Sequence, residues 1–274
     1  MSDKLPEYEI YAIKYAQRDA KRASHFIGGD PHDAPMPMDY FVWVIQGNGQ
    51  TYLVDTGFTA EIAAQRKREH LRCPIESLSL LGIAPSKIND VILTHMHYDH
   101  AGSFHKLPHA RFHLQEKEMQ FVTGRHMRYP FFQRSFEVEE VVGLVRLNFK
   151  GQVELVSGEV EFAPGITLHP TPGHTAGLQV VRVHTKRGWV VLASDASHYY
   201  ENMRQNRPYS TAFHIGDMVD SYRVLERLAP SPAHIVPGHD PLVMKEYPAP
   251  ERSMEGIVIR LDVAPKQIEV PKYS

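Results

Sequence analysis

Apolar and polar side chains alternate along the first part of the chain, which predicts short β-strands. We expect strands at 8–13, 40–45 and 51–54, with a turn at Gly47-Asn48-Gly49 joining the last two. This opening predicts antiparallel sheet. Further along, short apolar or alternating stretches predict strands at 87–94, 111–114, 165–169, 178–184, 189–193 and 234–236.

Helical periodicity alternates with these strands. It predicts helices at 60–72, 115–122, 138–147 and 217–228. In the third we expect the valines to face the core, and in the fourth Met218, Val219, Tyr222 and Leu225. The segment 125–136 has no clear period, and Pro130 argues against a core helix there. The proline-rich stretch 247–274 is expected to wrap over the surface.

The chain has 274 residues, and its composition is that of a globular protein with a large core, at 42% hydrophobic and 23% charged residues. We expect one layered α/β domain over residues 1–274. The formal charge of −2 disfavours nucleic acid and anionic membranes as partners. No stretch is long and apolar enough to span a membrane, so a cytoplasmic location is expected. Cys73 is the only cysteine, which excludes a thiolate metal cluster.

The candidate chemistry begins at His95-Met96-His97-Tyr98-Asp99-His100, directly after the predicted strand 87–94. In an extended segment alternate side chains share a face, so His95 and His97 can reach one metal ion. Asp99 and His100 can then turn towards a second ion. Polar loop residues at a strand end are the alternative, but metal-ligand side chains at this density rarely arise for solubility alone.

This segment closely resembles the HxHxDH signature of the metallo-β-lactamase superfamily. Further motifs of that family follow the same order, from about residue 38 to residue 240: Val54-Asp55-Thr56-Gly57, Thr171-Pro172-Gly173-His174-Thr175, Asp195 after a strand, and Gly238-His239. The resemblance implies an αββα sandwich, in which two mixed β-sheets are flanked by helices and the metals lie at one edge.

The resemblance also implies a complete set of metal ligands. The first ion is assigned to His95, His97 and His174. The second is assigned to Asp99, His100 and His239, and Asp195 bridges the two. Asp55 is expected to orient a ligand, although a simple turn aspartate is the alternative. Zinc is the default for this nitrogen and oxygen set, while iron, manganese and cobalt also fit.

Two metal ions about 3.5 to 4 Å apart supply a bridging hydroxide and polarise a carbonyl. Asp99 then carries a proton to the leaving group. The stretch Asp195-Ala196-Ser197-His198 and the sequence Gly238-His239-Asp240 resemble the N-acyl homoserine lactone lactonases, the quorum-quenching branch. Those enzymes typically have a tyrosine where this chain has His198. We expect His198 to take that catalytic role, or Tyr199 or Tyr200 to rotate in, or the substrate to differ.

The leading hypothesis is therefore a metallo-hydrolase that opens a lactone ring, with a small-molecule substrate. A glyoxalase II-like thioester hydrolase is the alternative, but the short proline-rich tail does not resemble that family's basic C-terminal region. A nuclease would need a basic exosite, and a flavodiiron enzyme would need a flavin domain. A metal-stabilised binding protein would not need a complete set of ligands for an active centre.

Two further segments are candidates for contacts with the substrate or with a second subunit. The loop at about 24–38 carries Phe26, Ile27, Met36 and Met38, which either contact an acyl chain or pack on their own domain. The aromatic residues Tyr129, Phe131, Phe132 and Phe136 either cap the pocket or form a homodimer interface.

Overall fold

A computed structural model describes residues 4–266. Its larger sheet has eight strands in the order β13-β1-β2-β3-β5-β6-β7, with β4 paired to β1. The hairpin β2–β3 is antiparallel, and β3, β5, β6 and β7 run parallel. The strands are β1 (Glu9–Arg18), β2 (Met38–Gly47), β3 (Gln50–Val54), β4 (Glu69–His70), β5 (Asp90–Ile92), β6 (Arg111–Gln115), β7 (Val153–Val156) and β13 (Val258–Arg260).

The second sheet has five strands in the order β12-β11-β10-β9-β8. They are β8 (Val160–Ala163), β9 (Ile166–Pro170), β10 (Gln179–Thr185), β11 (Gly188–Ser194) and β12 (Ile235–Pro237). Only the β11–β12 pair among these is parallel. The predicted strands are thus confirmed, although the pattern analysis missed β4, β7, β8 and β13.

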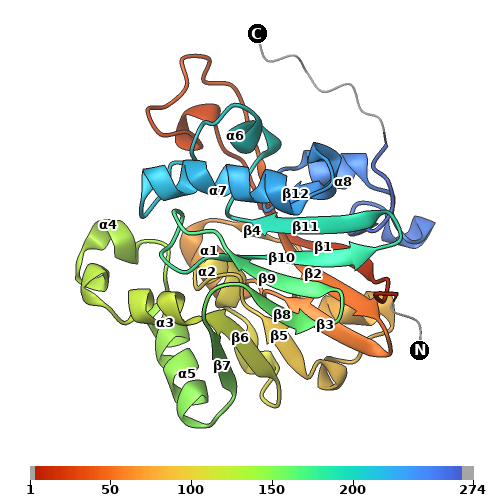
Figure 1. The fold of residues 1–274 in the computed structure, drawn as a ribbon. Helices are drawn as coiled ribbons and strands as arrows, with labels where there is room; N and C mark the ends of the chain where they lie inside the picture. Colours follow the sequence, from red (N-terminus) through yellow and green to blue (C-terminus); the bar gives the residue numbers. More distant parts are fainter. Residues whose placement is uncertain (1–3, 267–274) are drawn as a thin grey trace.

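Helices cover the outer faces of the two sheets (Figure 1). The helix α7 packs on β11, whereas α3 and α5 pack on β6 and β7 at the other sheet. This arrangement confirms the αββα sandwich. The helices are α1 (Ala60–Arg66), α2 (Tyr98–Ala101), α3 (Glu116–Val122), α4 (Pro130–Gln133), α5 (Val138–Phe149), α6 (Tyr200–Arg204), α7 (Ile215–Leu228) and α8 (Leu242–Glu246), with short 3-10 turns between them. Within residues 4–266, no helix is both long and apolar enough to cross a bilayer.

The helix predicted at 60–72 is wrong in its second half. It ends at Arg66, because Lys67 takes a left-handed conformation with φ 55° and its N–H bonds back to Ala63 and Ala64. The chain then enters β4, which pairs with β1. Residue periodicity does not register a left-handed residue that is not glycine, so the pattern ran on past the true end.

The helix α5 is confirmed, but its predicted core face is only partly right. Val141 packs against the core, whereas Val138 is 73% exposed, and the buried side chains of the helix are Glu140 and Leu144. Gly143 contributes to this face, because a Cβ there would lie 2.6 Å from the Phe104 ring.

Two further expectations change. Pro130 does not prevent a helix in the segment 125–136 but begins one, since α4 has this proline in its first turn. The stretch after Tyr247 is not only a surface wrap: it contains a 3-10 turn (Arg252–Met254) and the strand β13, whose Val258 and Ile259 are buried beside β1. Residues 267–274 of that predicted wrap lie outside the described part.

Candidate metal centre

The histidine segment lies at the end of β5, at the edge where the parallel strands of the larger sheet finish. His95 and His97 are in the connection that follows β5, and the short helix α2 begins directly after His97. The helical turn places Asp99 and His100 in a second group beside His95 and His97, with the rings of His95 and His100 4.1 Å apart. All of these side chains are buried, with at most 8% exposed.

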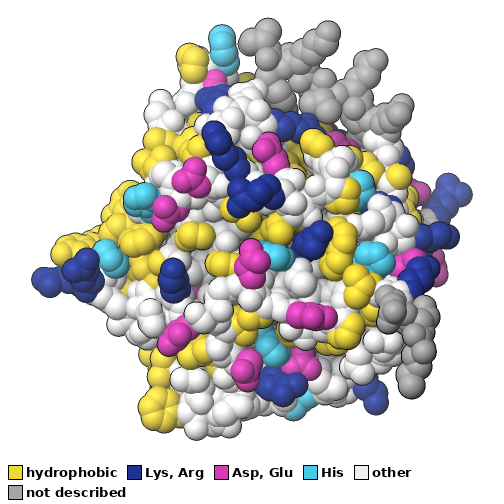
Figure 2. Space-filling view, in the orientation of Figure 1, with side chains coloured by type: hydrophobic (Ala, Val, Ile, Leu, Met, Phe, Trp, Pro, Cys, Tyr) yellow, Lys and Arg dark blue, Asp and Glu magenta, His cyan; other side chains and the backbone are white. Residues whose placement is uncertain are grey.

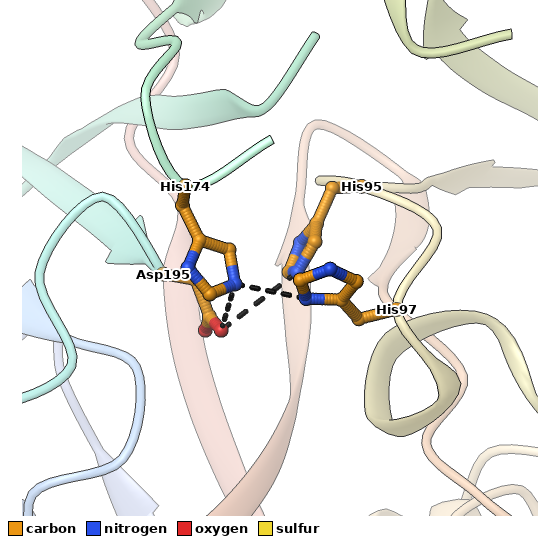
Figure 3. A group of neighbouring side chains, drawn as sticks. All are labelled: His95, His97, His174 and Asp195. Carbon is orange, nitrogen blue, oxygen red and sulfur yellow. Dashed lines mark hydrogen bonds and ion pairs between the residues drawn. The ribbon is translucent and has the colours of Figure 1, made fainter. Parts of the chain in front are cut away.

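The remaining candidate ligands come from the second sheet. His174 follows β9, Asp195 follows β11, and His239 follows β12. Figure 3 shows His174 and Asp195 pointing towards His95 and His97 across the gap between the two sheets. The structure therefore brings every residue of the predicted ligand set together, as two groups that each lie within metal-binding reach: His95, His97, His174 and Asp195 in one, and Asp99, His100 and His239 in the other.

Asp195 lies between the two groups and turns one carboxylate oxygen to each. Its Oδ2 is 3.0 Å from His174 Nε2 and 3.7 Å from His95 Nε2. Its Oδ1 is 2.9 Å from His239 Nε2 and 3.2 Å from His100 Nε2. Burial opposes its ionisation, but the imidazoles around it hold the pKa of Asp195 well below the usual range. An ionised carboxylate in this position suits a bridge between two cations.

The inward-facing atoms of the cluster fit metal ions better than they fit one another. Among the described residues, the Nε2 atoms of His95, His100 and His239 are buried without a hydrogen bond. Burial, reinforced by neighbouring imidazoles, lowers the pKa of His95 and His97 well below its ordinary value, so these rings are neutral. Neutral rings with unpaired inward nitrogens are the form that binds metal.

Hydrogen bonds on the outer ring nitrogens hold these histidines in place. His174 Nδ1 lies 2.8 Å from the Thr211 carbonyl oxygen, and His239 Nδ1 lies 2.8 Å from the Asp39 carbonyl oxygen. A carbonyl can only accept, so both rings carry a proton on Nδ1 and turn their Nε2 towards the centre.

Asp55 has the orienting position expected for it. Its carboxylate lies 2.7 Å from His100 Nδ1 and accepts hydrogen bonds from the backbone N–H and the hydroxyl of Thr94. Thr94 also lies 2.9 Å from the Ser194 hydroxyl, which joins the two sheets behind the cluster. Asp55 and Ser194 have left-handed backbones, with φ 62° and 45°. Strained backbone of this kind is common where side chains must be aimed.

Sequence reasoning missed Glu118 on α3. This buried carboxylate accepts hydrogen bonds from Met96 N at 3.0 Å, Thr175 Oγ1 at 2.7 Å and Gly177 N at 3.0 Å. It therefore ties the loop that carries His95 and His97 to the loop that carries His174. No local motif marks Glu118, which resembles any acidic residue in a first helical turn.

His198 lies inside the centre and is only 2% exposed. Its Nε2 is 3.0 Å from Asp195 Oδ2, and its ring stacks on Tyr209 at 3.4 Å between centroids and 8° between planes. Tyr199 and Tyr200 are buried, and the Tyr199 hydroxyl donates to the Pro37 carbonyl, away from the metals. The tyrosine at this site is therefore Tyr209, which sequence analysis did not single out.

A cavity of about 200 Å³ opens over the cluster and is lined by both ligand groups. Among the lining side chains that are not candidate ligands, we call six the cavity wall: Arg18, Tyr40, Arg68, Tyr98, His198 and Tyr209.

The early loop contributes less to this cavity than expected. Of the apolar residues considered in 24–38, Met38 lines it. Phe26 is buried elsewhere, with the Arg207 guanidinium 3.9 Å from the centre of its ring. Ion pairs of Arg22 with Asp30 and Glu201 hold the loop against α6.

The aromatic segment meets the centre through Phe136, whose ring lies 4.5 Å from that of His97. Beside it is a larger hollow of about 1000 Å³ between α1, α4 and α5, mostly apolar, which shares Arg66 and Arg134 with the cavity. Tyr129 and Phe131 are half exposed. Hydrophobic side chains gather at the left of Figure 2, over the part of the molecule where α4 lies in Figure 1.

Comparison with known proteins gives the same picture. An N-acyl homoserine lactonase of Bacillus sp. is 31% identical over 137 residues, 50% of this chain and 49% of that protein. The chain thus matches about half the length of the first curated relatives. N-acyl homoserine lactonase AttM of Azorhizobium caulinodans is 26% identical over 239 residues, covering 78% of this chain and 85% of that protein.

A solved N-acyl homoserine lactone hydrolase, with the product N-hexanoyl-L-homoserine bound at its catalytic metal centre, superposes with a TM-score of 0.72. The match covers 88% of this chain and 96% of that one. The two sequences are 20% identical, so the likeness shows a shared fold. The family model of the metallo-β-lactamase superfamily matches residues 36–239, which include every candidate ligand. By its sequence, its fold and this match, the chain belongs to the metallo-β-lactamase superfamily.

Proposed function

We propose that this protein is a hydrolase with two divalent metal ions that opens a lactone ring, with N-acyl homoserine lactones or a related cyclic ester as the substrate. The placement of Asp195 carries the proposal, because each of its oxygens faces a separate group of buried ring nitrogens. The named lactonases among the relatives support the choice of a lactone.

The residues assigned to the two ions are those of the sequence-based hypothesis. His95, His97 and His174 hold the first ion. Asp99, His100 and His239 hold the second, and Asp195 bridges. We propose zinc for both, since neutral imidazoles and carboxylates are its usual ligands. When bound, two such ions activate water near neutral pH and polarise the ester carbonyl.

The protein's own groups then position the substrate and move protons. Asp99 is 8% exposed and lines the cavity, with its Oδ2 3.7 Å from His239 Nε2 and 3.8 Å from His100 Nε2. This carboxylate is the group that passes a proton to the ring oxygen as the lactone opens.

Two side chains share the role that a tyrosine has in the lactonase branch. His198 donates its Nε2–H to the Asp195 carboxylate, so its buried and unpaired Nδ1 is an acceptor. Tyr209 accepts a hydrogen bond from Arg18 at 3.2 Å, which leaves its own O–H free to donate. We assign to Tyr209 the hydrogen bond that is donated to the substrate oxygen. We assign to His198 the roles of holding Asp195 and contacting the substrate.

The cavity size suits this reaction. About 200 Å³ accommodates a small ring but no long chain. An acyl group attached to the ring would extend past Phe136 and Met38 towards the larger apolar hollow. The homodimer stays a prediction, with the exposed Tyr129 and Phe131 as its candidate contacts.

A substrate panel on metal-replete protein tests the proposal. Acid release would be measured from acylated homoserine lactones, simple γ-lactones, a glutathione thioester and a β-lactam. We expect ring opening of lactones, lost in His97→Ala while circular dichroism stays that of the parent. Turnover of the thioester or the amide without any lactone would contradict the assignment. Elemental analysis of the purified protein tests zinc.

A further inference from the structure

Two half-buried arginines in the cavity wall have no acidic partner among the described residues, and a third lining arginine without one, Arg134, is exposed. Arg18 is at the end of β1, and Arg68 lies between α1 and β4. Both are half-buried, and neither forms an ion pair within residues 4–266, although such pairs are common elsewhere in the molecule. Arg66, which also lines the cavity, is paired with Glu137. A half-buried charge without a counterion is costly, so its retention points to a ligand.

The guanidinium groups also have unused donors. Arg18 donates from Nη2 to Tyr209 at 3.2 Å, while its Nε is buried without a hydrogen bond. Arg68 donates from Nε to the Tyr98 hydroxyl at 3.1 Å and from Nη1 to the Arg66 carbonyl at 2.7 Å. Each guanidinium carries five N–H donors, so both have several left.

The tyrosines around these arginines do not neutralise them. Tyr209 accepts a hydrogen bond from Arg18 and Tyr98 accepts one from Arg68, and a hydroxyl is not a counterion. The carboxylates that line the cavity, Asp99 and Asp195, belong to the candidate metal ligands. Arg18 and Arg68 both line the cavity, so the two cations share one space.

We propose that Arg18 and Arg68 bind a carboxylate of the substrate, so that the preferred lactone is an acid-bearing one and not a neutral ring. This inference rests on the proposed function, because it places the anion beside the ester to be opened. A guanidinium binds a carboxylate through paired N–H donors, and the unsatisfied donors of the cavity wall offer that contact. The anion would also relieve the repulsion between the two arginines.

Matched substrates test the preference. We would measure kcat/KM for γ-butyrolactone and for 5-oxotetrahydrofuran-2-carboxylate, which differ by one carboxylate. The parent should favour the anionic lactone by about 10- to 100-fold, the range of a charged hydrogen bond. Arg18→Gln and Arg68→Gln should each reduce that ratio by about 10-fold. Arg68→Lys should recover part of it, and Arg146→Gln, at an exposed position on α5, should leave it unchanged.

A binding measurement without turnover provides the second readout. Sodium sulfate, compared with sodium chloride at equal ionic strength, should raise the melting temperature of the holoenzyme. The double variant Arg18→Gln/Arg68→Gln should lose this rise. Metal content and circular dichroism identify a double variant that has failed to fold, and the single variants Arg18→Gln and Arg68→Gln then replace it in the comparison.

The outcomes separate this inference from the proposed function. If both lactones are opened at equal kcat/KM, or if the ratio is the same in the arginine variants, the carboxylate site is refuted while the lactonase stands. If neither lactone is opened but sulfate stabilises only proteins that retain the arginines, the anion site stands and the lactonase fails. Equal stabilisation of the double variant by sulfate also refutes the site.

Discussion

The metal cluster and the cavity wall above it are built in different ways. In the cluster, hydrogen bonds hold the outer ring nitrogens of the histidines, for example with Thr211 for His174 and with Asp55 for His100. Both regions contain buried nitrogens that lack a hydrogen bond among the described residues: Nε2 of His95, His100 and His239 in the cluster, and Arg18 Nε and His198 Nδ1 in the wall. The cluster histidines are held through their outer nitrogens before any ligand arrives, whereas the unpaired groups of the wall belong to side chains that line the cavity.

This difference teaches where the reaction and the selectivity lie. Residues that must hold an ion follow strand ends, where two sheets fix their backbones. Residues that meet the substrate also come from β1, β2, the α1–β4 connection and the segment before α7. Two of these segments support the cluster as well, through Asp39 and Thr211. We expect substitutions in the cluster to abolish activity, and substitutions in the wall to change which substrate is used.

The most severe test of the comparison is Asp195→Asn. The amide cannot give an anionic oxygen to both ligand groups, so we expect the metal content to fall and the rate of lactone hydrolysis to drop about 10³-fold or more. Asp217→Asn, at an exposed position on α7, is the matched control. Full activity in Asp195→Asn would show that the carboxylate does not bridge.

The next effect is expected behind the cluster. Asp55→Asn keeps the shape of the side chain but weakens its contact with His100 Nδ1 at 2.7 Å. Loss of such an orienting partner typically lowers metal affinity about 10- to 100-fold. Competition with a chelator measures this affinity. An unchanged affinity would make Asp55 a plain turn residue.

The wall should respond more mildly. Tyr209→Phe removes the hydroxyl but keeps the ring that stacks on His198 at 3.4 Å. With one hydrogen bond to the reacting oxygen lost, we expect kcat to fall about 10-fold while metal content stays at the parent value. Steady-state kinetics with elemental analysis test this. If kcat falls in His198→Asn but not in Tyr209→Phe, the donor is His198 and not Tyr209.

The smallest effect concerns Glu140 in the larger hollow. Burial raises the pKa of Glu140 to about 9 from 4.5, and among the described residues its Oε2 has no hydrogen bond. The folded protein therefore binds a proton that the unfolded chain releases above pH 4.5, so this group makes the free energy of unfolding fall as pH rises from 4.5 to 9.

Glu140→Gln should remove that contribution. Melting temperatures of parent and variant, taken at pH 6 and pH 9, should diverge by roughly a few °C in favour of the variant at the higher pH. Parallel curves would mean that Glu140 is ionised or hydrated in the folded protein.

The sequence predicted the cluster better than the wall for a physical reason. The ligands occur in short motifs whose spacing follows from strand ends and turns, so His95 to His100 were recognisable from local order. The site residues Glu118, Tyr209 and Arg18 are defined by contacts with distant segments, and nothing in their neighbours marks them. The predicted valine face of α5 was partly wrong for a similar reason, because the close approach of Gly143 to Phe104 contributes to the packing.

The strand β13 has a consequence for the order of assembly. It pairs with β1, so the edge of the larger sheet joins residues from the two far ends of the described chain, Tyr11 with Arg260. Pairing at such sequence separation is slow, because a long loop must close before the contact forms. His239, also late in the chain, donates to the carbonyl of Asp39 in β2. The metal centre should therefore be among the last parts of the molecule to become competent during folding, and early intermediates should bind metal weakly.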